Sequence, residues 1–223
     1  MVVDFPEIIE VLKSNANPEK AVGMAKYGIN PDNTLGVNIP FLHKAAKEIG
    51  KDHSLAMQLW DYGIHEARIL AAFIDEPGMV TQGQIETWVE DFNSWDVCDQ
   101  VCSNLFDKTP FAYTKAVEWS GSDKEFVKRA GYVLMACLAV HDKKADDKKF
   151  MKFFPLIVKG ATDERNFVKK AVNWALRQIG KRNSNLNKEA VRTAEKIKLI
   201  PSRSARWIAS DALREFKLKS GKL

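Results

Sequence analysis

The sequence predicts an all-α fold, a right-handed superhelix of stacked helix pairs that forms a single domain over residues 1–223. Apolar residues recur every three to four positions along most of the chain, and no segment alternates as a half-buried strand does. Two similar segments, EFVKRAGYVLMACL and NFVKKAVNWALRQI, place Phe126 and Phe167 41 residues apart. This spacing is typical of two-helix HEAT-like repeats, of which about five or six fit the chain.

The elements follow in order from the N-terminus. A first helix is predicted over residues 5–13, and a second begins at Asn17-Pro18, because Pro is favoured in the first turn. The stretch from Tyr27 to Pro40 is dense in Gly, Pro and Asn and is predicted to be a loop. One later helix begins at His65-Glu66, where we expect local hydrogen bonds. The later helices are predicted at 40–49, 53–62, 65–74, 82–92, 94–106, 110–120, 123–140, 147–160, 164–180, 187–198 and 202–217.

Charge is distributed unevenly along the chain. Residues 1–120 hold 9 basic and 18 acidic residues, a net charge of −9, whereas residues 121–223 hold 25 and 11, a net charge of +14. Such asymmetry suggests a polyanionic partner that docks mainly on the C-terminal half, with a basic concave face formed by residues 121–223. The alternative is a solvated helical surface that happens to be basic.

Other sequence features bear on location and cofactors. No apolar run reaches the ~18 residues that a membrane span needs, and acidic residues stand near the N-terminus where a signal peptide would be basic. The three cysteines form no disulfide pattern, so we expect a cytoplasmic protein with no membrane association. Cys98 and Cys102 are four apart without a nearby histidine, so neither a metal nor another cofactor is expected.

Residues 93–99 (NSWDVCD) form the first candidate site. Asn93 or Ser94 can cap a helix N-terminus, and Trp95 and Asp99 then share one helical face because they are four positions apart. On spacing alone, a half-buried tryptophan beside a capping or ion-paired aspartate is favoured over a catalytic pair. The core-facing stripe of this helix is predicted to contain Val97, Val101 and Leu105.

A second candidate site lies in the basic segment FVKKAVNWALRQIGKRN. Its Trp174 could stack on a sugar or base while basic neighbours bind phosphates, or it could be a core tryptophan beneath a solvated basic face. The pair Lys128-Arg129 aligns with Lys169-Lys170 in the next repeat. A superhelix would therefore line up basic side chains as a track for phosphates.

NSWDVCDQVC, EFVKRAGYVLMA and FVKKAVNWALRQIGKRN resemble, in this order, three signature segments of the AlkD-type alkylpurine DNA glycosylases, the HEAT-like-repeat DNA alkylation repair family. KYGINPDNTLGVNIP resembles that family's tyrosine followed by a Leu-Gly-Ile turn and a proline. The resemblance extends from about Lys26 to Arg182 and more loosely to the end. Its specific part is the ordered occurrence of W-D-x-x-D and N-W-A-L-R.

The resemblance implies a role for each matching residue. Asp99 matches the catalytic carboxylate, and Trp95 and Trp174 match the two aromatics that flank the deoxyribose of the lesion. Arg129 matches the arginine that contacts the backbone beside the lesion, and Tyr27 matches a tyrosine near the site. The DNA-binding set expected with Tyr27 consists of Lys128, Lys169, Lys170, Arg177, Lys181 and Arg182.

The leading hypothesis is a monofunctional DNA glycosylase that hydrolyses the N-glycosidic bond of cationic N3- or N7-alkylated purines in duplex DNA without deep capture of the base in a pocket. It is expected to act as a monomer with no obligate protein partner. A second hypothesis is a non-catalytic HEAT-like-repeat protein that recognises damaged or branched DNA. A third is a protein-interaction scaffold, against which the basic C-terminal half argues, because peptide-binding scaffolds need no phosphate track.

Overall fold

The computed structural model describes residues 4–220, with side chains to residue 217. Within these residues every regular element is a helix, and none of the helices is long and apolar enough to cross a membrane. The chain divides into two compact units, unit 1 (Met1–Thr109) and unit 2 (Pro110–Leu223).

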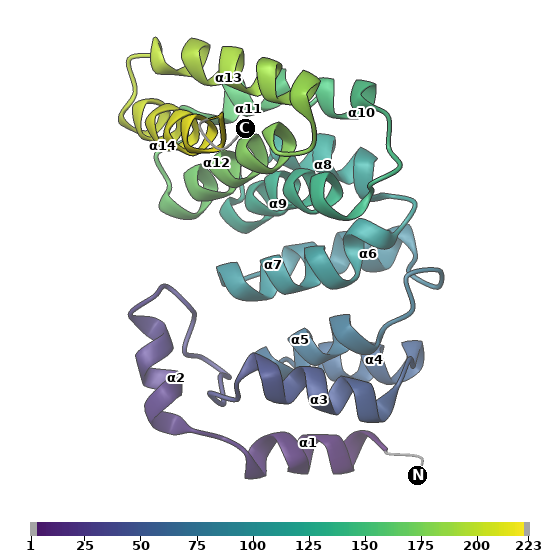
Figure 1. The fold of residues 1–223 in the computed structure, drawn as a ribbon. Coiled ribbons are helices and arrows are strands. Elements are labelled where there is room, and N and C mark those ends of the chain that lie inside the picture. Colours follow the sequence, from purple (N-terminus) through teal and green to yellow (C-terminus); the bar gives the residue numbers. More distant parts are fainter. Residues whose placement is uncertain (1–3, 221–223) are drawn as a thin grey trace. The chain divides into compact units, whose positions relative to one another are not determined.

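Unit 1 is organised around the helix that begins at His65. Its helices are α1 (Phe5–Ser14), α2 (Pro18–Ala25), α3 (Ile39–Ile49), α4 (His53–Asp61), α5 (His65–Ile74), α6 (Gln82–Glu90), α7 (Trp95–Asn104) and the 3-10 helix η1 (Phe106–Lys108). Helix α5 packs against α3, α4 and α7. Helix α2 runs across the direction of α1 and α3, and the loop that follows it leads to α3 (Figure 1).

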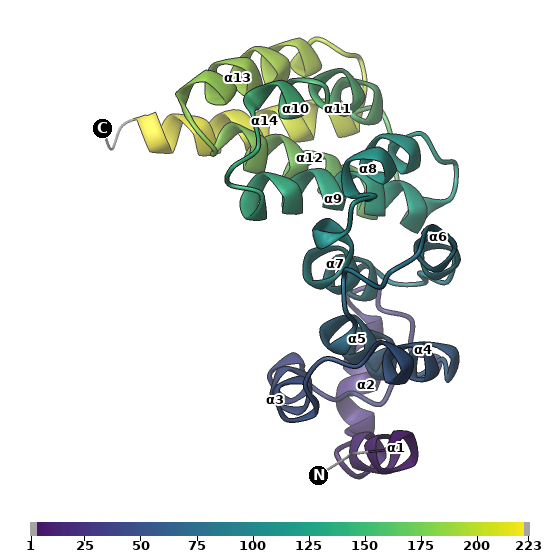
Figure 2. The same cartoon turned by 90° about the vertical axis from the view of Figure 1, so that its right-hand side faces the viewer.

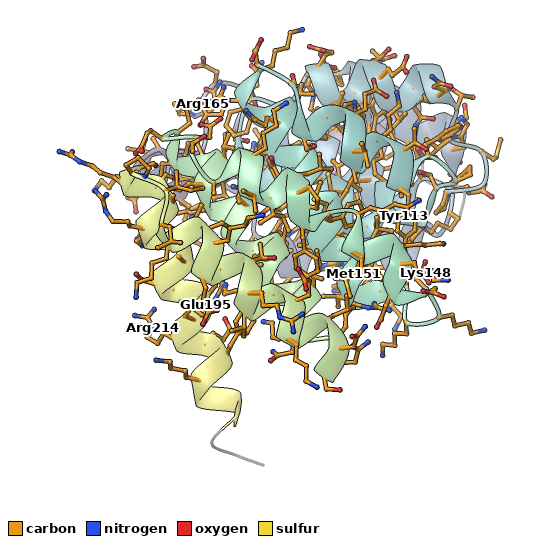
Figure 3. All side chains as sticks on the ribbon, turned by 90° about the horizontal axis from the view of Figure 1, so that it is seen from above. Tyr113, Lys148, Met151, Arg165, Glu195 and Arg214 are labelled. Carbon is orange, nitrogen blue, oxygen red and sulfur yellow. The ribbon has the colours of Figure 1, made fainter. Side chains whose placement is uncertain are left out.

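The helices of unit 2 pack in two rows. Its helices are α8 (Ala112–Ser120), α9 (Glu125–His141), α10 (Asp147–Met151), α11 (Phe154–Gly160), α12 (Asn166–Gly180), α13 (Ser184–Lys198) and α14 (Arg203–Ser220). Helices α9, α12 and α14 pack in sequence as one row, and α8, α11 and α13 form the other (Figure 2). The outer surface carries many basic side chains, such as the exposed Lys148 and Arg214 (Figure 3).

Local signals in the sequence explain where most helices begin. The side chains of Asp4, Asn17 and Asn38 cap α1, α2 and α3 respectively, each by accepting a backbone N–H in the first turn of its helix. Each of these helices also has a proline at its first or second position. Such caps satisfy amides that have no partner inside the helix. The predicted starts of these helices are therefore confirmed to within a residue or two.

The prediction of one helix over residues 147–160 is wrong, because the structure contains two helices there, α10 and α11. Pro155 stands in the first turn of α11, where its ring is tolerated. In a continuous helix it would remove a hydrogen bond and clash with the carbonyl one turn earlier. Helix α13 begins at Ser184, ahead of the predicted 187, because the side chain of Asn183 caps it by accepting the Leu186 amide at 2.9 Å.

Each unit has its own close-packed core. In unit 1 the rings of Trp60 and Trp88 stack with centroids 3.9 Å apart, and both are fully buried. In unit 2 a Cβ at Gly131 of α9 would collide with the backbone of Ser120 in α8. The small residue therefore lets α8 and α9 approach closely.

The buried carboxylate of Glu66 holds the loop before α3. Its Oε2 accepts the amide of Leu35 at 2.9 Å, and its Oε1 accepts those of Gly36 at 2.7 Å and Val37 at 3.2 Å. Gly36 has φ of +79°, and a Cβ there would collide with the Asn17 carbonyl. The expectation of local hydrogen bonds at the start of α5 is therefore wrong for Glu66, whose partners lie 29 to 31 residues away.

Candidate functional site

Helix α7 presents Trp95 and Asp99 one turn apart, and both are half-buried. The indole Nε1 of Trp95 donates to the Tyr27 carbonyl oxygen at 3.0 Å, which fixes the ring against the loop after α2. Ser94 occupies the N-cap position, but its side chain accepts no capping bond. The predicted core-facing stripe is confirmed, since Val97, Val101 and Leu105 are each at most 1% exposed.

A pocket of about 500 Å³ lies in unit 1 beside Trp95. Its walls come from α2, the following loop, the start of α3, α5 and α7. Tyr27, which is 75% exposed, also lines it. The carboxylate of Glu66 holds the backbone of the loop residues Gly36 and Val37, which form part of the wall.

His65 and Asp96 form a buried pair that lines the same pocket. The His65 Nε2 lies 2.8 Å from Asp96 Oδ2, although the two residues are 31 positions apart. Asp96 Oδ1 accepts the amide of Val97 at 3.0 Å. The pair joins the N-terminal ends of α5 and α7, and it places a carboxylate in the wall of an otherwise largely apolar pocket.

In unit 2, Arg129 is buried between α9 and α12. It is 5% exposed, and its Nη1 donates to the Phe167 carbonyl oxygen at 2.6 Å. This bond ties α9 to the first turn of the helix that carries Trp174, which is half-buried. A phosphate contact by Arg129 would therefore have to use the small part of the residue that remains exposed.

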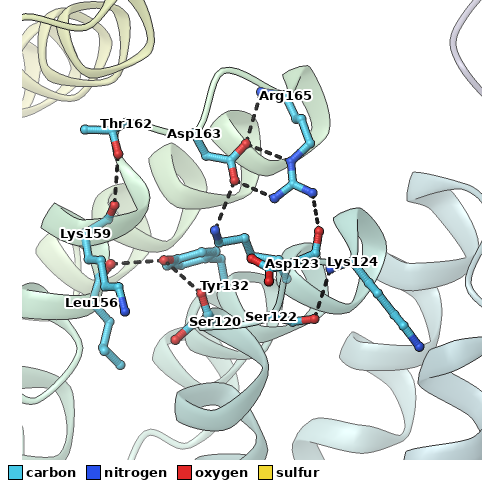
Figure 4. A network of polar contacts seen from close by, with 11 residues as sticks. Ser120, Ser122, Asp123, Lys124, Tyr132, Leu156, Lys159, Thr162, Asp163 and Arg165 are labelled. Carbon is cyan, nitrogen blue, oxygen red and sulfur yellow. Dashed lines mark hydrogen bonds and ion pairs between the residues drawn. The ribbon is translucent and has the colours of Figure 1, made fainter.

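Lys128 pairs with Asp163, and Figure 4 shows the polar network of Asp163 and Arg165 to which this pair belongs. Its Nζ lies 3.1 Å from Asp163 Oδ2, and Arg165 forms a bidentate pair with the same carboxylate. Burial opposes ionisation of Asp163, but the hydrogen bonds from Arg165 and Lys128 outweigh it and lower its pKa to about 2. Arg165 also donates to the Asp123 carbonyl at 2.6 Å, so the network fixes the loops before α9 and α12.

Most of the other predicted DNA-binding residues of unit 2 have partners within the unit. Arg177 Nη1 lies 2.6 Å from Glu215 Oε2, and Lys181 Nζ lies 2.8 Å from Glu215 Oε1. Arg182 donates to the Ala139 carbonyl at 2.7 Å and covers the Phe150 ring. These contacts neutralise or bury part of the predicted phosphate track.

Two lysines of α12 are placed differently. The Lys169 ammonium lies 5.5 Å from the centre of the Trp207 ring, an aromatic residue that is 41% exposed. Lys170 is exposed. The predicted residue set includes Lys169 but not Trp207, the exposed aromatic residue beside it.

The sequence profile of the family described as DNA alkylation repair enzyme matches residues 8–216. The chain belongs to this family. A solved structure described as "A new family of proteins related to the HEAT-like repeat DNA glycosylases with affinity for branched DNA structures" is 18% identical, with a TM-score of 0.78 over 95% of each chain. A designed armadillo repeat protein in complex with peptide (KR)4 is 17% identical over 78% of this chain and 91% of its own, but its TM-score of 0.43 is too low for further argument. No curated protein matches the chain.

The likeness to the first of these structures confirms the predicted all-α fold of HEAT-like repeats. Tyr27, Trp95 and Asp99 belong to unit 1, whereas Arg129 and Trp174 belong to unit 2. The concave basic face of residues 121–223 remains a prediction. Within the described residues, no cluster of three or more His, Cys, Asp or Glu is arranged to hold a metal ion.

Sequence reasoning missed the pair of His65 and Asp96. Asp96 is the first acid of W-D-x-x-D, and His65 stands at a predicted helix start, but neither position indicates a contact between the two. Their contact spans 31 positions and depends on how α5 packs against α7. No local spacing rule could have found it.

Proposed function

We propose that the protein is a monofunctional DNA glycosylase that hydrolyses the N-glycosidic bond of cationic N3- or N7-alkylated purines in duplex DNA. The observation that carries the proposal is the placement of Trp95 and Asp99 on one face of α7, both half-buried and so accessible to a ligand. Membership of the DNA alkylation repair family and the basic C-terminal half support it.

The chemistry needs few groups. An alkylated cationic purine already has a weakened glycosidic bond, and its departure leaves an oxocarbenium-like sugar. Asp99 would stabilise this positive charge and orient the attacking water, while Trp95 and Trp174 would flank the sugar with their indole faces. The base departs with the bonding electron pair, which neutralises its charge, C1′ gains the hydroxyl group of water, and the remaining proton passes to the carboxylate or solvent.

Binding would draw on the positive charge of unit 2. Arg129 would contact the backbone beside the lesion, and exposed lysines such as Lys170 would bind phosphates without reading the base sequence. An enzyme that cleaves in this way binds the DNA backbone. The base need not enter a pocket before the glycosidic bond breaks.

The test is the release of 7-methylguanine and 3-methyladenine from alkylated duplex DNA by the purified protein. Asp99→Asn preserves size and removes the charge, and we expect it to slow release while leaving duplex affinity nearly unchanged. Asp61→Asn is the matched control, because Asp61 is an exposed acid at the end of α4 in the same unit. Equal release by wild type and Asp99→Asn would contradict the proposed role of Asp99.

An alternative is a non-catalytic protein that binds damaged or branched DNA. It is favoured by the likeness to the solved structure whose description names affinity for branched DNA. Tight binding of a three- or four-way junction together with no release of either methylated base would support this alternative over the glycosylase.

A further inference from the structure

Helix α14 buries one face and leaves the other open to solvent. The buried face consists of Ala205, Ile208, Ala209, Ala212 and Phe216, each at most 2% exposed. The helix packs against α12 and α13. The side chains on the face turned away from these two helices are therefore available to a partner outside the unit.

The open face carries a stripe of basic side chains with one aromatic ring among them. This α14 stripe consists of the exposed residues Arg203, Trp207, Ser210, Arg214 and Lys217. The intervals between them alternate between four and three positions, so all five share one side of the helix. At ~1.5 Å per residue, the stripe extends ~21 Å along the helix axis.

The acidic residues of α14 do little to neutralise this stripe. Glu215 pairs with Arg177 and Lys181 of α12, and Asp211 Oδ2 accepts Asn173 Nδ2 at 2.7 Å. Asp211 also pairs with Arg214 of the stripe. Among the residues that the structure describes, Arg203, Arg206 and Lys217 form no ion pair. The open face of α14 therefore keeps a net positive charge.

Trp207 gives this charged face a means of binding a base. Its side chain is large, yet the residue is 41% exposed, and the Lys169 ammonium lies over the ring at 5.5 Å from its centre. An exposed ring among cations is typical of surfaces that bind single strands, because the ring stacks on a base and the cations bind phosphates. In a duplex the base faces are covered by their neighbours, so a ring on a helix surface cannot stack on them.

A recess of about 520 Å³ adjoins the C-terminal part of the stripe. Lys198 at the end of α13 lines it together with Ser210, Leu213, Arg214 and Lys217 of α14. Three cationic side chains and a hydroxyl group around one recess suit a phosphate group, which accepts hydrogen bonds from all of them. The base-stacking ring and the phosphate recess thus lie along the same helix.

We propose that the α14 stripe binds single-stranded DNA, with Trp207 stacked on one base and a backbone phosphate in the recess beside Arg214. Membership of the DNA alkylation repair family favours DNA over RNA as the ligand. The stripe lies within unit 2 and includes neither Trp95 nor Asp99. Single-strand binding at the stripe is therefore independent of the proposed excision of alkylated bases.

The direct test is fluorescence anisotropy of a labelled oligothymidylate of about 20 nucleotides, titrated with the purified full chain at low ionic strength. An oligothymidylate does not pair with itself, so it stays single-stranded. We expect Trp207→Ala to weaken its binding at least about fivefold, as the loss of one base stack predicts, and Trp207→Phe to retain most of the affinity. Neither variant should change the affinity for a duplex of the same length.

Two control variants separate the stripe from general effects of aromatic surface and charge. Tyr62→Ala removes a similarly exposed ring in unit 1, where the residue is 44% exposed, and should bind the single strand like wild type. Arg206→Glu reverses a charge beside Trp207, whereas Lys148→Glu makes the same change at an exposed lysine of α10. We expect Arg206→Glu to weaken single-strand binding severalfold more than Lys148→Glu does.

Four results would overturn the proposal. They are wild type that does not bind the oligothymidylate, a folded Trp207→Ala variant that binds it like wild type, equal weakening by Arg206→Glu and Lys148→Glu, and tighter binding of the matching oligouridylate. Binding to phosphatidylserine vesicles that depends on Trp207, without binding to the oligothymidylate, would assign the stripe to a membrane surface instead. If circular dichroism shows that Trp207→Ala does not fold, the comparison of Arg206→Glu with Lys148→Glu decides.

Discussion

Replacement of Glu66 by Gln tests how the loop that lines the pocket is held. The carboxylate is 1% exposed and accepts three backbone amides, with Oε2 serving Leu35 and Oε1 serving Gly36 and Val37. A glutamine can keep its oxygen at the Oε1 position, but its amino group then faces the Leu35 N–H. One hydrogen bond to a charged group is lost, and two donors are opposed.

The loss of one such bond predicts a decrease of about 2 kcal/mol in the free energy of unfolding. For a chain of this size this corresponds to a fall in melting temperature of roughly 4–8 °C. Urea unfolding followed by circular dichroism measures the free energy. Hydrogen exchange of the amides of residues 35–37 reports the loop itself, and we expect it to accelerate in the variant.

Glu48→Gln is the matched control, because Glu48 is exposed and pairs with Lys44 at 3.9 Å on the surface of α3. Its effect should stay within about 0.5 kcal/mol, as for other surface changes. A Glu66→Gln variant as stable as wild type, with equally protected loop amides, would refute the assigned role of this carboxylate.

Three further predictions concern unit 2 and the site. Duplex affinity should fall steeply with salt, by roughly 10³–10⁵-fold between 50 and 200 mM if six to ten phosphates are contacted. Lys170→Glu should weaken binding to duplexes of any sequence. A duplex affinity that does not change with salt concentration would count against DNA binding. Asp163→Asn should destabilise the protein by about 2 kcal/mol at pH 7, because the pKa of Asp163 is lowered from 3.8 to about 2. This contribution is present above pH ~4 and is lost as the pH falls towards 2. In urea titrations the difference in free energy of unfolding between variant and wild type should therefore shrink as the pH is lowered. A difference that stays constant with pH would contradict the stabilising role of the Asp163 network. Trp95→Ala and Trp174→Ala should each reduce both duplex affinity and excision rate in gel-shift and base-release assays, and an unchanged rate in either would exclude that ring from the site.

The helices could be predicted because their signals are local. Asn17-Pro18 caps and starts α2, and apolar residues at helical spacing mark the buried faces of α7 and α12. The same reasoning missed the break before α11, in whose first turn Pro155 stands, because the apolar pattern on both sides of the break suits one helix as well as two.

The candidate site could be predicted only in part. Trp95 and Asp99 are four positions apart, so their common face follows from helical geometry. The pair of His65 and Asp96 could not be predicted, because it forms between helices that are 31 positions apart in the sequence. The same applies to Arg177, whose partner Glu215 is 38 positions away and neutralises its charge.

The proposed function depends most on Asp99 of α7, which would drive removal of a cationic alkylated purine. Its most direct test is the single-turnover rate of base release from a duplex with one 7-methylguanine, measured for wild type and Asp99→Asn. We expect release by wild type and a rate lowered about tenfold to a hundredfold in the variant, below the ~10²–10³ seen for such electrostatic contacts because the cationic base leaves readily. Wild type that binds this duplex and releases no base, or a variant that releases it at the same rate, would contradict the proposed function.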